Sequence, residues 1–226
     1  MFARILFAAV VAGLAAGLVM SAIQQWRVAP LILEAEIYEN AAAAHGVNEH
    51  LATEPEAWAP ADGLERIFYT VLADLLAAIG FALVIAAVSV FAGIEITPAN
   101  GLLWGLAGFV TFQLAPAFGL APELPGMPAA DLGMRQFWWW GTVLATAAAF
   151  LIVAKWRTPA TLALAAVLIL APHLIGAPAA PEAESGVPAH LATEFAANAL
   201  AAAGVFWLLV GPMMGWTLRR FAGTTP

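Results

Sequence analysis

The stretch FYTVLADLLAAIGFALVIAAVSVF, residues 68–91, decides the fold class of this chain. It is apolar almost throughout, and its only charged residue is Asp74. A helix needs about 20 mostly apolar residues to cross a bilayer, and this run is long enough. Because it is rich in Ala and Leu and lacks the period-2 alternation of a membrane strand, it predicts a membrane-spanning helix.

The composition of the whole chain extends this prediction to all 226 residues. Hydrophobic residues make up 63% and charged residues 10% of the chain, whereas soluble domains have roughly 45–50% apolar and about 25% charged residues. A net charge of −7 with 8 Lys and Arg residues excludes a basic track for nucleic acid. Cysteine is absent, which excludes disulfides and thiolate metal ligands. No phosphate-binding P-loop string is present, and we expect no organic cofactor.

Six stretches in all are long and apolar enough to be spans. Only Lys155-Trp156-Arg157 separates the fourth from the fifth, which predicts a helical hairpin with a short charged turn. The sequence thus predicts an all-α, polytopic transmembrane helical bundle, a single integral membrane domain over residues 1–226. A polar, partly helical outer loop is expected over residues 24–67, with its helix reaching about His45. The expected spans are residues 2–23, 68–91, 101–120, 137–154, 158–175 and 195–218.

The first span leaves two interpretations open. Arg4, an apolar run and the small residues Ser21-Ala22 resemble a signal peptide that is cleaved off. The run is longer than a usual signal core, however, and small residues repeat every four positions from Ala9 to Ser21, as they do on a helix-packing face. This repeat favours a retained helix.

The basic residues predict the orientation. With six spans both termini lie on one side, and on that side the basic residues all sit at span ends, where the positive-inside bias is strongest. We therefore expect a multi-pass protein of the bacterial inner membrane, with cytoplasmic termini. The side of the termini receives Arg4, Lys155, Arg157, Arg219 and Arg220, and the outer side receives Arg27, Arg66 and Arg135.

Histidine and most carboxylate residues fall on the outer side in this topology. His45 and Glu49 stand four positions apart, as do His50 and Glu54, so each pair would share one face if the helix resumes after Gly46. His190 and Glu194 repeat this spacing in the sixth helix. Imidazole and carboxylate together suit divalent metals such as cobalt, nickel and zinc, and acid weakens such binding because a protonated imidazole is no ligand. The alternative is that these are solvated polar residues. The candidate metal ligands are His45, His50, His173, His190, Glu39, Glu49 and Glu123.

Three further polar residues lie within the expected spans, namely Asp74, Gln113 and Asn198. Polar and ionisable groups are costly in a membrane and often mark an ion pathway. All three fall in the outer part of the bilayer, where they would line a hydrophilic funnel. The alternative is that each satisfies a neighbouring helix. The inner half offers little beyond Ser89 and Thr161, which suggests a partner, an oligomer or a conformational change.

Several sequence strings are similar to those of one known family. They are Asp62-Gly-Leu-Glu-Arg66, Gly101-Leu-Leu-Trp-Gly-Leu-Ala-Gly108, Pro116-Ala-Phe-Gly-Leu-Ala-Pro-Glu-Leu-Pro-Gly126, Arg135-Gln-Phe-Trp-Trp139 and Pro172-His-Leu-Ile-Gly-Ala-Pro178. Together they resemble the CbtA family of proposed cobalt transporter subunits over essentially the whole chain. The resemblance implies cobalt uptake linked to cobalamin synthesis and a small single-span partner, CbtB, with a histidine-containing tail. Where such proteins often read Gly-Leu-Pro-Pro-Glu, this chain has Ala121 in place of the first proline.

The sequence therefore predicts a membrane subunit for the uptake of a divalent metal that is captured on the outer face. Cobalt is the first candidate, and nickel and zinc are alternatives. A non-transporting membrane scaffold or metal sensor that acts through its outer loops is the competing interpretation. An intramembrane enzyme is disfavoured because no H-E-x-x-H string is present, and no catalytic residue is expected.

Overall fold

The computed structural model describes residues 2–44, 58–182 and 185–222. Within these ranges every regular element is a helix, which confirms the predicted all-α fold. Four helices there are long and apolar enough to cross a membrane, and two shorter apolar helices, Gly101–Ala117 and Pro159–Ile175, accompany them. This agrees with a bundle of about six helices. The four long helices are Phe2–Ala41, Leu64–Ala92, Leu132–Lys155 and Ala189–Phe221.

The first helix does not stop where the predicted first span ends. α1 (Phe2–Ile23) passes through a π-helical turn, η1 (Gln24–Val28), into α2 (Ala29–Ala44) without leaving helical geometry. The continuous helix Phe2–Ala41, of 40 residues, is about 60 Å long, roughly twice the thickness of a hydrocarbon core. The expected outer loop thus begins as a continuation of the first helix, and α2 extends past the part of the helix that can cross the membrane.

A second π-helical turn interrupts the third apolar segment. α4 (Gly101–Phe109) continues through η2 (Val110–Leu114) into the short α5 (Ala115–Ala117). Both π turns come just before a proline, Pro30 in the first helix and Pro116 in the second. Proline lacks the N–H of the regular helix ladder, and a widened turn is one way in which a helix adapts to a local break of that ladder.

Three of the four remaining helices are longer than the predicted spans, and Pro159–Ile175 is one residue shorter than its predicted span. α3 (Leu64–Ala92) ends at Gly93, which adopts the left-handed conformation with φ 64°. α6 (Leu132–Lys155) begins earlier than expected because the Asp131 side chain caps it, accepting a hydrogen bond from the backbone N–H of Met134 at 2.9 Å. α7 (Pro159–Ile175) completes the predicted hairpin with α6, and α8 (Ala189–Ala222) is the last helix.

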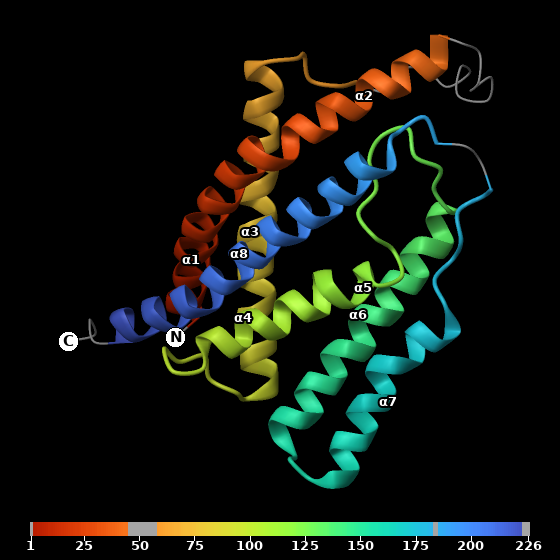
Figure 1. Ribbon diagram of the computed structural model, residues 1–226. Coiled ribbons are helices and arrows are strands. Elements are labelled where there is room, and N and C mark those ends of the chain that lie inside the picture. The colour runs from red at the N-terminus through yellow and green to blue at the C-terminus, as the bar shows by residue number, and fades with distance from the viewer. Residues whose placement is uncertain (1, 45–57, 183–184, 223–226) are drawn as a thin grey trace.

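The helices form two groups (Figure 1). α1, α3, α4 and α8 pack into one bundle, whereas α6 and α7 form a hairpin beside it that contacts the bundle mainly through η2 and α5. Glycine permits the closest approaches in the bundle. A Cβ at Gly13 would lie 2.8 Å from Cα of Ile79 on α3, and Gly211 of α8 lies directly against Gly101 and Gly105 of α4.

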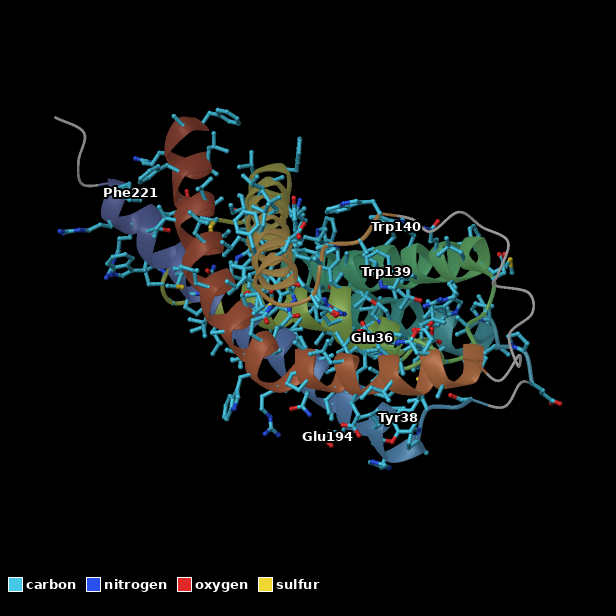
Figure 2. The ribbon with its side chains drawn as sticks, turned by 90° about the horizontal axis from the view of Figure 1, so that it is seen from above. Glu36, Tyr38, Trp139, Trp140, Glu194 and Phe221 are labelled. Carbon is cyan, nitrogen blue, oxygen red and sulfur yellow. The ribbon has the colours of Figure 1, made fainter. Side chains whose placement is uncertain are left out.

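Both ends of the described chain lie at one end of the molecule (Figure 1). The rings of Phe7 and Phe221 are in edge contact there, with centroids 5.0 Å apart. Figure 2 shows Phe221 at this end and Glu36 and Glu194 toward the other, where α2 lies beside α8. The even number of crossings that the sequence predicts is therefore consistent with the arrangement of the helices.

Candidate functional site

The bundle encloses a cavity of about 310 Å³ at the level of the two π turns. Its walls come from α1, η1, α2, α3, η2 and α8 and are mostly apolar. Three polar side chains line it, those of Gln24, Asp74 and Gln113. Two of the three predicted pathway residues therefore meet in one cavity.

Among the described residues that line this cavity, Asp74 is the only one with an ionisable acidic or basic side chain. Its Oδ1 accepts a hydrogen bond from Nε2 of Gln24 at 3.2 Å. Its Oδ2 is buried and has no hydrogen-bond partner among the described residues, and the buried hydroxyl of Ser21 is its other polar neighbour. A carboxylate within an apolar bundle with one unbonded oxygen is costly, so Asp74 is a candidate functional group.

The two π turns explain how both glutamines reach the cavity. Gln24 is the first residue of η1, and Gln113 is the fourth residue of η2. A π turn inserts one residue into the helical repeat, so it changes which side chains face inward on either side of it. Turns of this kind are frequent at functional sites.

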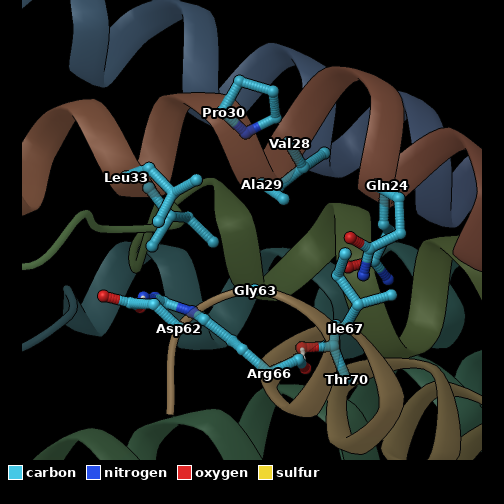
Figure 3. A pocket seen from close by; sticks show the side chains of 12 residues that line it. Gln24, Val28, Ala29, Pro30, Leu33, Asp62, Gly63, Arg66, Ile67 and Thr70 are labelled. Atoms are coloured by element: carbon cyan, nitrogen blue, oxygen red, sulfur yellow. Dashed lines mark hydrogen bonds and ion pairs between the residues drawn. The ribbon is translucent and has the colours of Figure 1, made fainter.

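Each glutamine also lines a pocket of its own outside the central cavity. Both of these outer pockets lie nearer the end of the molecule that carries the 118–131 segment and the start of α3. Gln24 borders a pocket of about 550 Å³ between α2 and the start of α3, with Asp62 and Arg66 on its wall (Figure 3). Gln113 borders a pocket of about 300 Å³ that also holds Glu123 and Arg135. The central cavity thus shares one glutamine with each of two outer pockets.

An ion pair stands in each outer pocket. Arg66 contacts Asp62 at 3.2 Å and also pairs with Glu36 of α2. Arg135 contacts Glu123 at 3.0 Å. These contacts join α2 to α3 and the proline-rich segment to α6.

Aromatic rings close the cavity on the side of the termini. The rings of Phe112 and Trp207 are stacked with centroids 5.7 Å apart, and Phe81 lies 5.1 Å from Phe112 and 5.2 Å from Trp207. Phe81 follows Asp74 by two turns of α3, so these rings lie about 10 Å deeper in the bundle than the carboxylate. The polar wall therefore ends at a layer of packed rings.

The predicted metal ligands do not form one cluster in the described part of the chain. His45, His50 and Glu49 lie outside the described residues. Glu39 lies on α2 against Gly126 of the proline-rich segment, and His190 is exposed in the first turn of α8. The described ranges contain no group of three or more His, Asp or Glu side chains that could hold a metal ion.

Two other candidate ligands already have neighbours. The ring of His173 lies against those of Trp138 and Phe118, with centroids 5.8 Å and 6.1 Å away. Glu123 is the partner of Arg135 described above. Neither side chain faces a second imidazole or carboxylate in a group large enough for a metal site within the described ranges.

Asn198, the third predicted pathway residue, is not part of the cavity wall. Its Oδ1 accepts a hydrogen bond from Nε of Arg27 at 3.2 Å, and its Nδ2 donates to the carbonyl of Glu194 at 2.8 Å. It thus ties α8 to η1. The third polar residue of the cavity is Gln24 and not Asn198. The sequence analysis did not identify Gln24, because a polar pair directly after an apolar run indicates the end of a span.

Comparison with known proteins gives one assignment. No curated protein and no solved structure matches the chain. The model of the family described as "Probable cobalt transporter subunit (CbtA)" matches residues 2–219, which is almost the whole sequence. The chain is thus a multi-pass membrane protein that belongs to the CbtA family of probable cobalt transporter subunits.

Proposed function

We propose that this chain is the membrane subunit that carries a divalent cation, cobalt first, from the outer face to the cavity at Asp74. One observation carries the proposal. A half-buried carboxylate, whose Oδ2 is buried without a hydrogen bond from the described residues, shares a cavity with two glutamine side chains, and each glutamine also borders an outer pocket. Ionisable groups inside a membrane protein are typical of ion pathways.

The chemistry of the cavity suits a hydrated cation in transit. Its oxygen ligands are one carboxylate and two amide carbonyls, a weak set for cobalt, which prefers imidazole nitrogen when it is bound tightly. About 310 Å³ leaves room for several water molecules around an ion. Conduction requires a site that binds strongly enough to admit the ion and weakly enough to release it.

The proposed direction is inward from the outer pockets. The cavity shares its wall with those pockets, whereas the rings of Phe81, Phe112 and Trp207 occupy its other side. Passage to the cytoplasm would require these rings to move, as in transporters that open alternately to the two sides. We propose cytoplasmic termini, which the distribution of basic residues supports.

Capture of the metal on the outer face belongs to the same proposal. His45, His50 and His190, with Glu39 and Glu49, would bind the ion before it reaches the pockets, and nickel or zinc are alternative cargoes. The family description of the chain as a subunit means that it acts in a complex. We propose a small single-span CbtB-like protein as its partner in the bacterial inner membrane.

The test is cobalt uptake by cells that express the chain together with the proposed CbtB-like partner. Asp74→Asn keeps the size of the side chain and removes its charge, and we expect uptake to fall about tenfold or more, a change of about 1.4 kcal/mol. Asp74→Glu should retain part of the uptake. Glu65→Gln, which removes an exposed carboxylate in the first turn of the same helix, is the matched control.

The level of each variant in the membrane is measured in the same cells. Wild-type uptake by Asp74→Asn at an equal level would contradict the proposal. Uptake of cobalt, nickel and zinc that is the same with and without the gene would favour the scaffold or sensor instead.

A further inference from the structure

A further cavity, of about 620 Å³, lies at the end of the molecule that carries both termini. It is bordered by the first turns of α1, the ends of α3 and α8 and the segment 93–98. Two arginines, Arg4 and Arg219, line it together with one acidic residue, Glu95. Much of the remaining wall is apolar, with Ile5, Val90 and Leu218 among its residues.

The arginines of this cavity lack the partners that arginines have at the other end of the molecule. Arg66 and Arg135 each form an ion pair, but neither Arg4 nor Arg219 forms one with any described residue. Nε of Arg4 is buried, and within the described ranges it has no hydrogen-bond partner. A buried guanidinium N–H without an acceptor is unfavourable, so an acceptor supplied by a ligand would stabilise it.

The charge and shape of the cavity limit the ligand. Two arginines and one glutamate leave a single positive charge, which matches one phosphodiester group. Guanidinium groups bind phosphate oxygens through paired N–H donors. The apolar wall suits an acyl chain, and the cavity lies where α1 begins and α3 ends, at the depth of lipid headgroups if α3 crosses the membrane.

We propose that this cavity binds the headgroup of an anionic phospholipid, with Arg4 and Arg219 donating to its phosphodiester. The apolar wall then covers part of the glycerol and acyl region. Basic pockets between helices on the cytoplasmic side of a membrane commonly bind such headgroups. The bound lipid would link the ends of α1, α3 and α8, the three long helices whose packing also forms the Asp74 cavity.

The test measures thermal unfolding of the purified full-length chain in detergent, with added phosphatidylglycerol, phosphatidylcholine or inorganic phosphate. We expect phosphatidylglycerol to raise the Tm of the wild type by about 3 °C or more, since a ligand that binds only the folded state stabilises it. Arg4→Gln and Arg219→Gln should lose most of this rise. Arg220→Gln is the matched control, because Arg220 stands next to Arg219 and is exposed like it but does not line the cavity.

Each other outcome overturns the proposal. An equal rise in Arg4→Gln, Arg219→Gln and the wild type would show that the arginines do not hold the lipid. An equal rise with phosphatidylcholine would exclude recognition of the headgroup charge, and an equal rise with inorganic phosphate would make the ligand a free anion. If Arg4→Gln does not fold, native mass spectrometry of Arg219→Gln and Arg220→Gln decides, with retained phosphatidylglycerol expected only in the second.

Discussion

Nε2 of Gln24 donates a hydrogen bond to Oδ1 of Asp74 across 3.2 Å, joining two residues that are 50 positions apart in the sequence. The glutamine stands at the start of a π turn, and the aspartate stands about two turns into the run 68–91, which holds no other charged residue. This contact orients the one carboxylate of the central cavity and leaves its second oxygen unbonded among the described residues. The proposed pathway depends on this pair.

Replacing Gln24 should therefore impair transport. Gln24→Ala removes the described donor to Asp74 and one of the two amide side chains of the cavity, so we expect cobalt uptake to fall several-fold. Asn40→Ala, which removes an exposed amide from the same continuous helix, should leave uptake unchanged. Equal uptake by Gln24→Ala and the wild type would show that Asp74 does not need this partner.

The close contact of α4 with α8 predicts a contrast between two glycines. A Cβ at Gly211 would overlap the backbone of Gly101, so Gly211→Ala should lower stability by about 1–3 kcal/mol. Gly80 on α3 has open space where a Cβ would lie, so Gly80→Ala should leave stability unchanged or raise it by about 0.5–1 kcal/mol. Thermal unfolding in detergent measures both, and a Tm for Gly211→Ala at or above that of Gly80→Ala would contradict this account of the packing.

Replacing the histidine residues distinguishes a role in metal binding from a role in packing. If the outer imidazoles bind the metal, replacing His45, His50 or His190 with Ala should weaken cobalt binding in a titration of the purified chain, with little change of Tm for the exposed His190. His173→Ala should in addition lower the Tm, because its ring packs against Trp138 and Phe118. Lowering the pH from about 8 to about 5.5 should weaken binding, since protonated imidazoles are not ligands. Full binding in all four variants would remove these residues from the proposal.

Hydropathy was sufficient to predict the helices but not their ends. The polar pair Gln24-Gln25 and the nearby Pro30 are typical of a helix end, and yet the helix continues because a π turn absorbs the break. Whether a helix stops or widens at such a point depends on what packs against it. Here α8 and the start of α3 lie alongside, and one sequence does not reveal those neighbours.

The candidate site could be predicted only in part. Asp74 stands out because it is the lone charge in a long apolar run, and Gln113 follows from the same argument. The pairing of Asp74 with Gln24 depends on the way Gly13 and Gly17 bring α1 against α3, which spacing along one helix does not show. His190 and Glu194, four positions apart, are both exposed on α8. They do not belong to a group of three or more candidate ligands among the described residues.

The most direct test of the proposed pathway is anomalous X-ray diffraction from crystals of the protein soaked in a cobalt salt. The account predicts a cobalt peak in the central cavity, within about 5 Å of the Asp74 carboxylate if a water molecule lies between ion and ligand, and its loss in crystals of Asp74→Asn. Well-occupied cobalt sites elsewhere on the molecule, with no cobalt in the cavity of the wild type, would contradict it.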